Sequence, residues 1–228
     1  EAMAEPIQGV VLASGGLDSC VTAALAAREG GIALLHATYG QRTARRERRA
    51  FEAIADRLGV PDRRRRVLDL AFLSELGGSA LTDPRIHVPE TEPVRGDGLP
   101  ATYVPFRNAH LLVAAVSWAE LLGAGTVWIG AVEEDSSGYP DCREGFLRSF
   151  QEAAREGSSR PDLEIRAPLV HRRKVEIVRL GHELGAPLEL TWSCYQREER
   201  ACGRCESCRL RLAAFAAAGI EDPIPYER

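Results

Sequence analysis

The stretch GVVLASGGLDSC, residues 9–20, decides the fold of this 228-residue chain. Its apolar first half predicts a buried strand over residues 7–13, and a helix is expected over 19–29. Between them, Gly15 and Gly16 have no side chains, so their backbone N–H groups can approach an anion closely. The positive N-terminal end of the following helix points to the same place. The sequence therefore predicts a phosphate-binding loop between a strand and a helix.

The side chains of this loop suit a nucleotide. Ser14 and Ser19 carry hydroxyls, and the Asp18 carboxylate can hold Mg2+ or a ribose hydroxyl. The loop lacks the Gly-Lys-Ser/Thr ending of a Walker motif. It resembles the pyrophosphate loop (PP-loop) of the ATP-pyrophosphatase superfamily, whose members bind ATP and transfer AMP to a substrate oxygen. That resemblance implies that ATP is held by Ala13, Ser14, Gly15, Gly16, Leu17, Asp18, Ser19 and Cys20. The alternative is an ordinary glycine-rich turn before a helix.

Composition places the chain among globular proteins. Its formal net charge is −4 and 45% of its residues are hydrophobic, which argues against a basic nucleic-acid-binding protein. No apolar run approaches the roughly 18 residues of a membrane helix. We therefore expect a cytoplasmic protein with neither a membrane nor a nucleic acid as partner. The length predicts a single domain over 1–228 with a C-terminal segment over 190–228.

Expected strands and helices alternate along the chain. Further strands are predicted over 32–38, 64–69, 126–132 and 163–167, and further helices over 43–58, 107–122, 143–156, 172–184 and 206–218; residues 77–105 are mostly loop. Such alternation predicts an α/β fold, a Rossmann-like parallel sheet with helices on both faces. Ligands of these sheets lie beyond the carboxyl ends of the strands. The loops after Ala13, Thr38 and Val132 are therefore expected to share one site.

Four of the six cysteines lie close together near the C-terminus: Cys194, Cys202, Cys205 and Cys208. Four thiolates in a short loop match the closed tetrahedral site of structural zinc. Gly203 permits a sharp reversal of the chain between two of the ligands. Free thiols, two disulfides or an iron–sulfur cluster are the alternatives. Zinc is expected to pin the C-terminal segment without taking part in the chemistry.

Other motifs lie where strands end or helices begin. Tyr39-Gly-Gln-Arg42 follows the second predicted strand, and Arg107 starts a helix with a fork suited to phosphate or carboxylate. The segment 133–143 brings acidic and aromatic groups suited to a polar heterocycle. Lys174 is the single lysine of the chain and can reach a phosphate. For each of these motifs, a solvated turn or a surface side chain is the alternative. Cys142, in the segment 133–143, is interpreted as a packing residue rather than a nucleophile.

Residues 42–66 contain ten arginines, including Arg63–Arg66, against four acidic residues. Such a run is compatible with an RNA-binding surface. A solvated helix face and edge strand are favoured, because aromatic side chains are not interleaved with the arginines and the whole chain is acidic.

Taken together, these motifs resemble the 7-cyano-7-deazaguanine synthase family over about residues 7–223. The matching blocks are Ser14–Ser19, Tyr39–Arg42, Gly77–Asp83, Tyr103–Pro105, Arg107-Asn108, Ser137–Arg143, Lys174 with Glu176, Leu190–Tyr195, the four clustered cysteines and Gly219–Pro223.

The resemblance implies a ligase that converts 7-carboxy-7-deazaguanine and ammonia to a nitrile, using ATP, Mg2+ and structural Zn2+. ATP adenylates the carboxylate, ammonia gives an amide, and a second ATP activates the amide for elimination. It also implies a homodimer. Catalytic roles would fall to Asp18, Ser19, Arg107 and Lys174, and substrate contacts to Tyr39, Gln41, Arg42, Arg107, Asn108, Asp135, Tyr139, Asp141 and Arg143.

The chain departs from the family pattern at four positions. Thr38 and Thr43 stand where Asp and His are usual, Phe106 replaces a small residue, and Arg173 replaces a threonine before the helix lysine. Two other functions stay open. One is a paralogue that stops at the amide or joins the carboxylate to another amine. The other is a PP-loop enzyme that modifies tRNA and uses the arginine-rich face together with Cys20 or Cys142.

Overall fold

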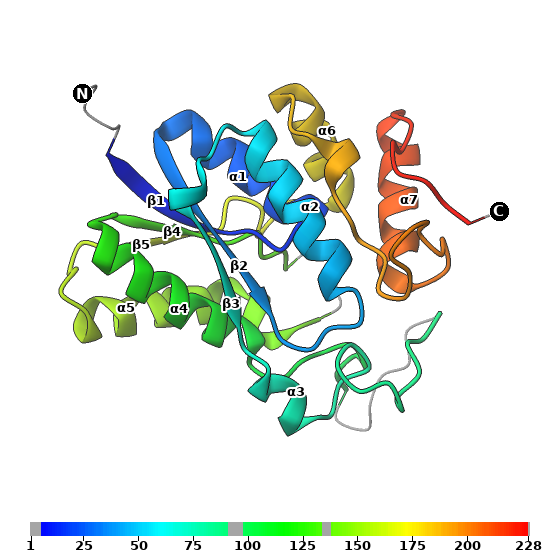
Figure 1. Ribbon diagram of the computed structural model, residues 1–228, viewed down its shortest axis with the longest axis horizontal. Helices are drawn as coiled ribbons and strands as arrows, with labels where there is room; N and C mark the ends of the chain where they lie inside the picture. Colours follow the sequence, from blue (N-terminus) through cyan, green and yellow to red (C-terminus); the bar gives the residue numbers. More distant parts are fainter. Residues whose placement is uncertain (1–5, 91–97, 134–137, 228) are drawn as a thin grey trace.

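A computed structural model describes residues 6–90, 98–133 and 138–227. Within these residues, five parallel strands form one sheet in the order β3-β2-β1-β4-β5. The strands are β1 (Ile7–Leu12), β2 (Gly31–Thr38), β3 (Arg65–Asp69), β4 (Thr126–Trp128) and β5 (Glu164–Arg166). The expected parallel α/β sheet is confirmed, and the chain reverses its direction of strand addition between β3 and β4 (Figure 1).

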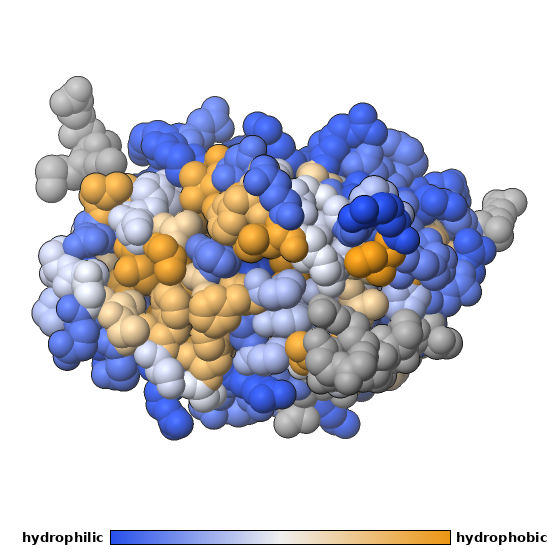
Figure 2. All heavy atoms as spheres, turned by 90° about the horizontal axis from the view of Figure 1, so that it is seen from below, coloured by the Kyte–Doolittle hydropathy of each residue, from blue (hydrophilic) through white to orange (hydrophobic). Residues whose placement is uncertain are grey.

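Helices cover both faces of the sheet (Figure 1). One face is covered by α1 (Leu17–Glu29) and α2 (Ala44–Arg57), and the other by α4 (Arg107–Leu122) and α5 (Glu144–Gly157). On the side of α4 and α5, Figure 2 shows apolar side chains gathered in a broad surface patch. Val113 and Leu121 of α4 are 55% and 84% exposed, so α4 is apolar on its outer face as well as its inner one.

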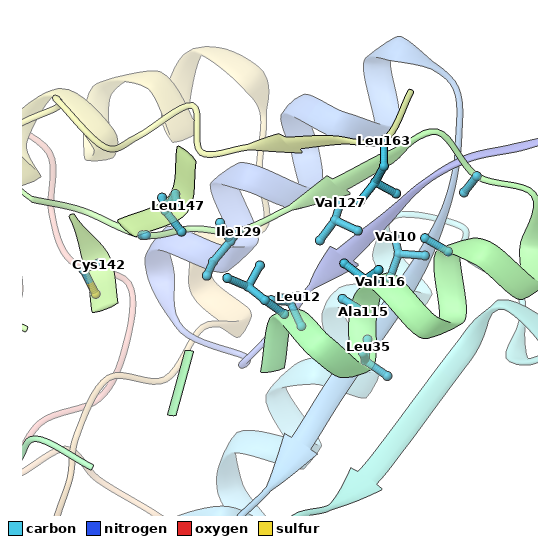
Figure 3. Close-up of a cluster of buried hydrophobic side chains, with 14 of the residues drawn as sticks. Val10, Leu12, Leu35, Ala115, Val116, Val127, Ile129, Cys142, Leu147 and Leu163 are labelled. Atoms are coloured by element: carbon cyan, nitrogen blue, oxygen red, sulfur yellow. The ribbon is translucent and has the colours of Figure 1, made fainter. Parts of the chain in front are cut away.

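Alternation of side chains along β1 divides the core between the two faces. Val10 and Leu12 join Leu112 and Val116 of α4, and this cluster continues to β4, α5 and Cys142 (Figure 3). Val11 points to the opposite face, where it packs with residues of α1 and α2. Both faces of β1 are buried, as expected for the central strand of a parallel sheet.

The C-terminal third of the chain packs beside α1. Helix α6 (Lys174–Leu184) crosses α1 at Gly181, where a Cβ would come within 2.8 Å of Val21 and 2.9 Å of Leu188. Helix α7 (Glu206–Ala218) packs on α6 and buries Phe215 in the same cluster. In Figure 1, α7 and the loops around it stand at the end of the sheet reached by the carboxyl end of β2.

The observed elements differ from the expected ones in three ways. Helix α1 begins at Leu17 rather than 19, so the loop after β1 is shorter. The strand predicted over 126–132 ends at Trp128, because the chain then passes close to the start of α1: a Cβ at Gly130 would lie 3.0 Å from the Ser19 nitrogen. A short helix, α3 (Phe72–Leu76), was not expected. Among the described helices, none has the length and apolar character needed to cross a membrane.

A buried ion pair holds the C-terminal segment. The Arg211 side chain is 2% exposed and donates to both carboxylate oxygens of Asp222 at 2.8–3.1 Å. Its remaining N–H groups donate to Thr191 Oγ1 at 2.7 Å and to the Leu188 carbonyl at 3.3 Å. Tyr226 Oη donates to Asp222 at 2.7 Å. Both charges are therefore desolvated but fully paired.

Removing one partner of this pair should be severely destabilising, because the other charge would remain buried. We predict that Asp222→Ala loses about 3–5 kcal/mol of unfolding free energy, a fall in Tm of roughly 6–20 °C for a chain of this size. The exposed Arg209 lies on α7, the helix that carries Arg211, and provides a control, since Arg209→Met should change Tm by less than about 2 °C. Equal Tm values for the two variants in thermal unfolding would contradict this interpretation of the pair.

Candidate functional site

A cavity of about 300 Å3 opens beyond the carboxyl ends of β1, β2 and β4. This is the point where the strand order reverses, which is the usual ligand site of open parallel sheets. Residues after all three strands, Ser14, Tyr39 and Val132 among them, line the cavity. The prediction that these loops share one site is confirmed.

Hydrogen bonds close the loop between β1 and α1 on itself. Ser19 Oγ donates to the Gly16 carbonyl at 3.1 Å and accepts from the Ser14 N–H at 3.1 Å. Ser14 Oγ lies 3.1 Å from Ser19 Oγ and accepts from the Gly16 N–H at 3.2 Å. A hydroxyl has one hydrogen, and that of Ser19 is taken, so Ser14 donates to Ser19. Both hydroxyls therefore maintain the shape of the loop.

Gly15 brings the loop against α2. Its φ is +87°, and a Cβ there would lie 2.5 Å from the Glu47 carbonyl. Its own carbonyl accepts from the Trp192 N–H at 2.9 Å. The loop is therefore fixed between α2 and the C-terminal segment, in a conformation that only glycine adopts easily.

Asp18 and Lys174 meet at the mouth of the cavity. Lys174 Nζ lies 2.7 and 2.9 Å from the two carboxylate oxygens of Asp18. The Lys174 side chain is 18% exposed and the Asp18 side chain is 27% exposed, so the pair is accessible from the cavity, which both residues line. The single lysine of the chain lies at the start of α6, 156 residues after Asp18 in the sequence. Its side chain nevertheless contacts the start of α1.

The far wall of the cavity holds a cation between aromatic rings. Arg107 Nη1 donates to Tyr39 Oη at 3.0 Å, and the guanidinium lies 5.4 Å from the Tyr39 ring and 5.9 Å from the Tyr139 ring. Such a cation can pair with a carboxylate, and the rings offer flat surfaces to a heterocycle. Burial raises the pKa of the Tyr39 hydroxyl, so it is uncharged at neutral pH.

Asp141 acts from behind this wall. Its carboxylate is buried and accepts from the Asn108 N–H at 2.8 Å, while Asn108 Nδ2 donates to the Asp141 carbonyl at 3.2 Å. These bonds fix the first turn of α4, which carries Arg107.

Burial raises the pKa of the Cys142 thiol to about 11. Cys142 is therefore a neutral packing residue at pH 7.

Gln41 and Arg42 line the cavity but are also tied to its walls. The Gln41 amide donates to Glu47 at 3.0 Å, and its oxygen accepts from the Tyr39 N–H at 2.7 Å. Arg42 donates to the carbonyls of Ala80, Asp83 and Ile86 at 2.6–2.9 Å. Arg42 thereby holds the loop 80–86 beside the cavity.

Some residues assigned to the site from the sequence do not line the cavity itself. Gly15, Cys20, Asp141 and Arg143 are not among the residues that line the cavity. The Cys20 thiol faces the Pro187 carbonyl at 3.9 Å, and Arg143 is exposed at the start of α5. Asp135 falls outside the described residues.

The C-terminal segment supplies a wall that sequence reasoning did not assign to the site. Trp192, Ser193, Tyr195 and Arg211 all line the cavity. Trp192 and Tyr195 belong to the block Leu190–Tyr195 noted above, which was the only available signal. Arg46 of α2 lies 4.4 Å above the Trp192 ring, so this wall is attached to the body of the sheet.

The four clustered cysteines are all buried, and their sulfur atoms lie within 4.8 Å of one another. A tetrahedral zinc with Zn–S bonds of about 2.3 Å would separate its sulfurs by about 3.8 Å, and the Cys202–Cys208 separation is 4.0 Å. Backbone N–H groups of Cys202 and Gln196 lie 3.4 Å from the Cys194 sulfur. Hydrogen bonds from Cys205 and Cys208, together with these, hold the pKa of Cys194 well below its usual range. The cluster could hold a metal such as zinc; among the described cysteines, no disulfide is formed.

The sheet and the loop after β1 define the class of protein: a Rossmann-like protein of the PP-loop type. A solved structure described as a predicted subunit of tRNA methyltransferase from Methanocaldococcus jannaschii shares the fold, with a TM-score of 0.50 and 14% identity over 97% of this chain and 93% of that one.

The family follows from sequence comparison. The family model described as Queuosine biosynthesis protein QueC matches residues 8–219. Proteins named 7-cyano-7-deazaguanine synthase are similar to this chain: the one from Koribacter versatilis is 56% identical, over 96% of this chain and 93% of its own length. The corresponding protein from Acidobacterium capsulatum is 54% identical over 96% of each. The chain belongs to the QueC family.

The four departures from the family pattern find local partners. Thr38 Oγ1 donates to the Leu68 carbonyl at 3.4 Å, and Thr43 Oγ1 donates to Glu47 at 2.8 Å. Before Lys174, Glu176 accepts from the Arg173 N–H at 2.8 Å and so caps α6. Of the four, Thr43 alone appears among the described residues that line the cavity.

Phe106 carries a backbone cost. Its φ of +57° lies in the left-handed region, which a small residue such as glycine adopts more easily. The Phe106 N–H donates to Tyr103 Oη at 3.0 Å, and its ring packs edge-on against Phe146 with centroids 5.8 Å apart. This strained residue directly precedes Arg107 and lies outside the cavity.

The cysteine cluster predicts a metal requirement. We expect the purified chain to contain one zinc ion per chain by elemental analysis, and Cys205→Ser to lose it together with several degrees of Tm, because structural zinc contributes folding energy. Cys142→Ser is the matched control, since Cys142 is buried outside the cluster. Metal-free wild-type protein with an unchanged Tm, or full zinc content in Cys205→Ser, would refute the assignment.

Proposed function

We propose that the chain converts 7-carboxy-7-deazaguanine and ammonia to 7-cyano-7-deazaguanine at the expense of ATP, as a ligase. The observation that carries the proposal is one cavity that joins the Ser14–Ser19 loop to the Arg107 wall. Backbone N–H groups and the start of α1 suit the phosphates of ATP. The opposite wall, with a cation and flat rings, suits a planar heterocycle that carries a carboxylate.

The chemistry requires two activations. A carboxylate oxygen of the substrate attacks the α-phosphorus of ATP and pyrophosphate leaves. Ammonia then attacks the acyl carbon, AMP leaves, and an amide forms. The amide oxygen attacks a second ATP in the same way, and loss of AMP and protons gives the nitrile. The protein's contribution is to position the reactants and to stabilise charge, which agrees with the neutral Cys142 beside the cavity.

Asp18 and Lys174 have complementary roles in this proposal. Lys174 can move from the Asp18 carboxylate to the departing pyrophosphate, which leaves Asp18 free to hold Mg2+. The metal would neutralise charge on the phosphates. The Ser19 hydroxyl maintains the loop that ATP and Mg2+ would approach, and the ion pair between Asp18 and Lys174 keeps both side chains in place.

Three observations favour the nitrile over the alternatives. Of the four departures from the family pattern, Thr38, Phe106 and Arg173 do not line the cavity, so they give little reason for a changed end point. Several of the ten arginines of the run 42–66 are paired with acidic side chains: Arg45 and Arg49 with Glu198 and Glu199, Arg57 with Glu189, and Arg65 with Glu52. Burial also raises the pKa of Cys20 to about 12, which disfavours it as a nucleophile for sulfur transfer.

Replacement of one carboxylate tests ATP use. We predict that Asp18→Asn releases AMP at least 100-fold more slowly than wild type in the presence of substrate, ATP, Mg2+ and ammonium, because a charged ligand for the metal is lost. Zinc content and Tm should be unchanged. Asp162→Asn, on the loop before β5, is the matched control and should match wild type. Asp18→Asn with wild-type AMP release would refute the role of this loop.

We further propose a homodimer formed through the outer face of α4. The exposed apolar residues Phe72, Leu76, Phe106, Val113 and Leu121 belong to or adjoin α3 and α4. Figure 2 shows apolar side chains gathered on this side of the molecule. Patches of this kind mark association sites.

Light scattering tests this arrangement. Wild type should give twice the chain mass of 24.9 kDa. Val113→Arg should give a monomer, because the interface would bury an unpaired arginine from each copy, which is strongly unfavourable. Glu183→Arg, on the exposed side of α6, should remain dimeric. A monomeric wild type, or a dimeric Val113→Arg, would contradict the proposed interface.

A further inference from the structure

A buried histidine lies beneath the loop that follows β1. His36 belongs to β2, is 1% exposed and stacks on Phe51 with ring centroids 5.1 Å apart. Its Nδ1 lies 2.9 Å from the Ala13 carbonyl oxygen. Since a carbonyl only accepts, Nδ1 carries the proton. Among the described residues, Nε2 has no hydrogen-bond partner.

The stability of the fold alone does not explain a histidine at this position. A buried polar atom without a partner is destabilising, so the unpaired Nε2 offsets part of the stability that the bond from Nδ1 to the Ala13 carbonyl contributes. Burial lowers the pKa of the imidazole, while its bond to Ala13 opposes this change. His36 is thus a neutral donor with a single partner, the last carbonyl before the loop.

The peptide that contains this carbonyl is the first of the loop. The Ala13 oxygen and the Ser14 N–H lie on opposite edges of one planar unit. His36 donates to the oxygen, and the N–H donates to Ser19 Oγ at 3.1 Å. Ser19 in turn bonds the Gly16 carbonyl. Fixing this plane therefore fixes the direction from which Ser14 and Gly16 present their groups to the cavity.

We propose that His36 is a positioning residue for the nucleotide: its Nδ1–H locks the Ala13–Ser14 peptide so that the loop is preorganised for the phosphates of ATP. The inference rests on the proposed ATP-dependent function. His36 acts through Ala13 and does not line the cavity itself. Loss of the bond should therefore weaken nucleotide binding more than it weakens the fold.

The test compares variants that keep or lose the donor. His36→Leu removes it, His36→Asn places an amide N–H near the position of Nδ1, and His36→Gln extends its amide towards the position of Nε2. We expect Mg–ATP to bind about 5- to 10-fold more weakly to the Leu and Gln variants in calorimetry, and within about twofold of wild type to the Asn variant. The Tm of His36→Leu should fall by only a few degrees, because the Ala13 carbonyl loses its donor while the unpaired Nε2 is removed with the ring, and its loss of activity should appear in KM for ATP more than in kcat.

Each outcome decides the inference. Wild-type affinity in His36→Leu overturns it. A parallel fall of Tm and affinity that His36→Asn does not restore also overturns it, because it assigns His36 to packing alone. If His36→Leu does not fold, the difference between the Asn and Gln variants decides. A wild-type chain that binds neither Mg–ATP nor inorganic pyrophosphate refutes the proposed function first, and this inference with it.

Discussion

The close approach of the loop after β1 to its neighbours is the constraint on which the site depends. Gly15 lies against the backbone of α2, and Gly130 lies against the start of α1. Neither contact leaves room for a side chain. The loop therefore packs directly on α2, and the segment after β4 packs directly on the start of α1. The C-terminal segment completes the enclosure, because the Trp192 N–H donates to the Gly15 carbonyl.

This constraint explains why a cysteine cluster far along the chain bears on the loop after β1. The cluster packs with Trp192 and Ala50 of α2, and the Arg211–Asp222 pair holds the same segment from the other side. A metal on the four cysteines would therefore stiffen the wall of the cavity without touching a reactant. Arginines of α2 serve the same end by pairing with Glu198 and Glu199.

The sequence predicted the parallel sheet and the shared site because hydrophobic runs and glycine positions are local signals. Lys174 attracted notice because it is the single lysine of the chain, and in the structure it forms an ion pair with Asp18. The wall formed by Trp192 and Arg211 could not be predicted in this way, since it depends on how distant segments pack. His36 was missed for the same reason: an isolated histidine in an apolar strand gives no sign of its partner. The early end of β4 follows from a contact with α1, which no local pattern encodes.

The central claim is that one cavity joins an ATP loop to a site for a heterocyclic carboxylate and carries the reaction to a nitrile. Mass spectrometry of the products formed from 7-carboxy-7-deazaguanine, ATP, Mg2+ and 15N-ammonium tests it most directly. The account predicts 7-cyano-7-deazaguanine that carries one 15N atom, with two AMP released per nitrile. An amide that accumulates with one AMP, or no 15N product at all, would contradict it.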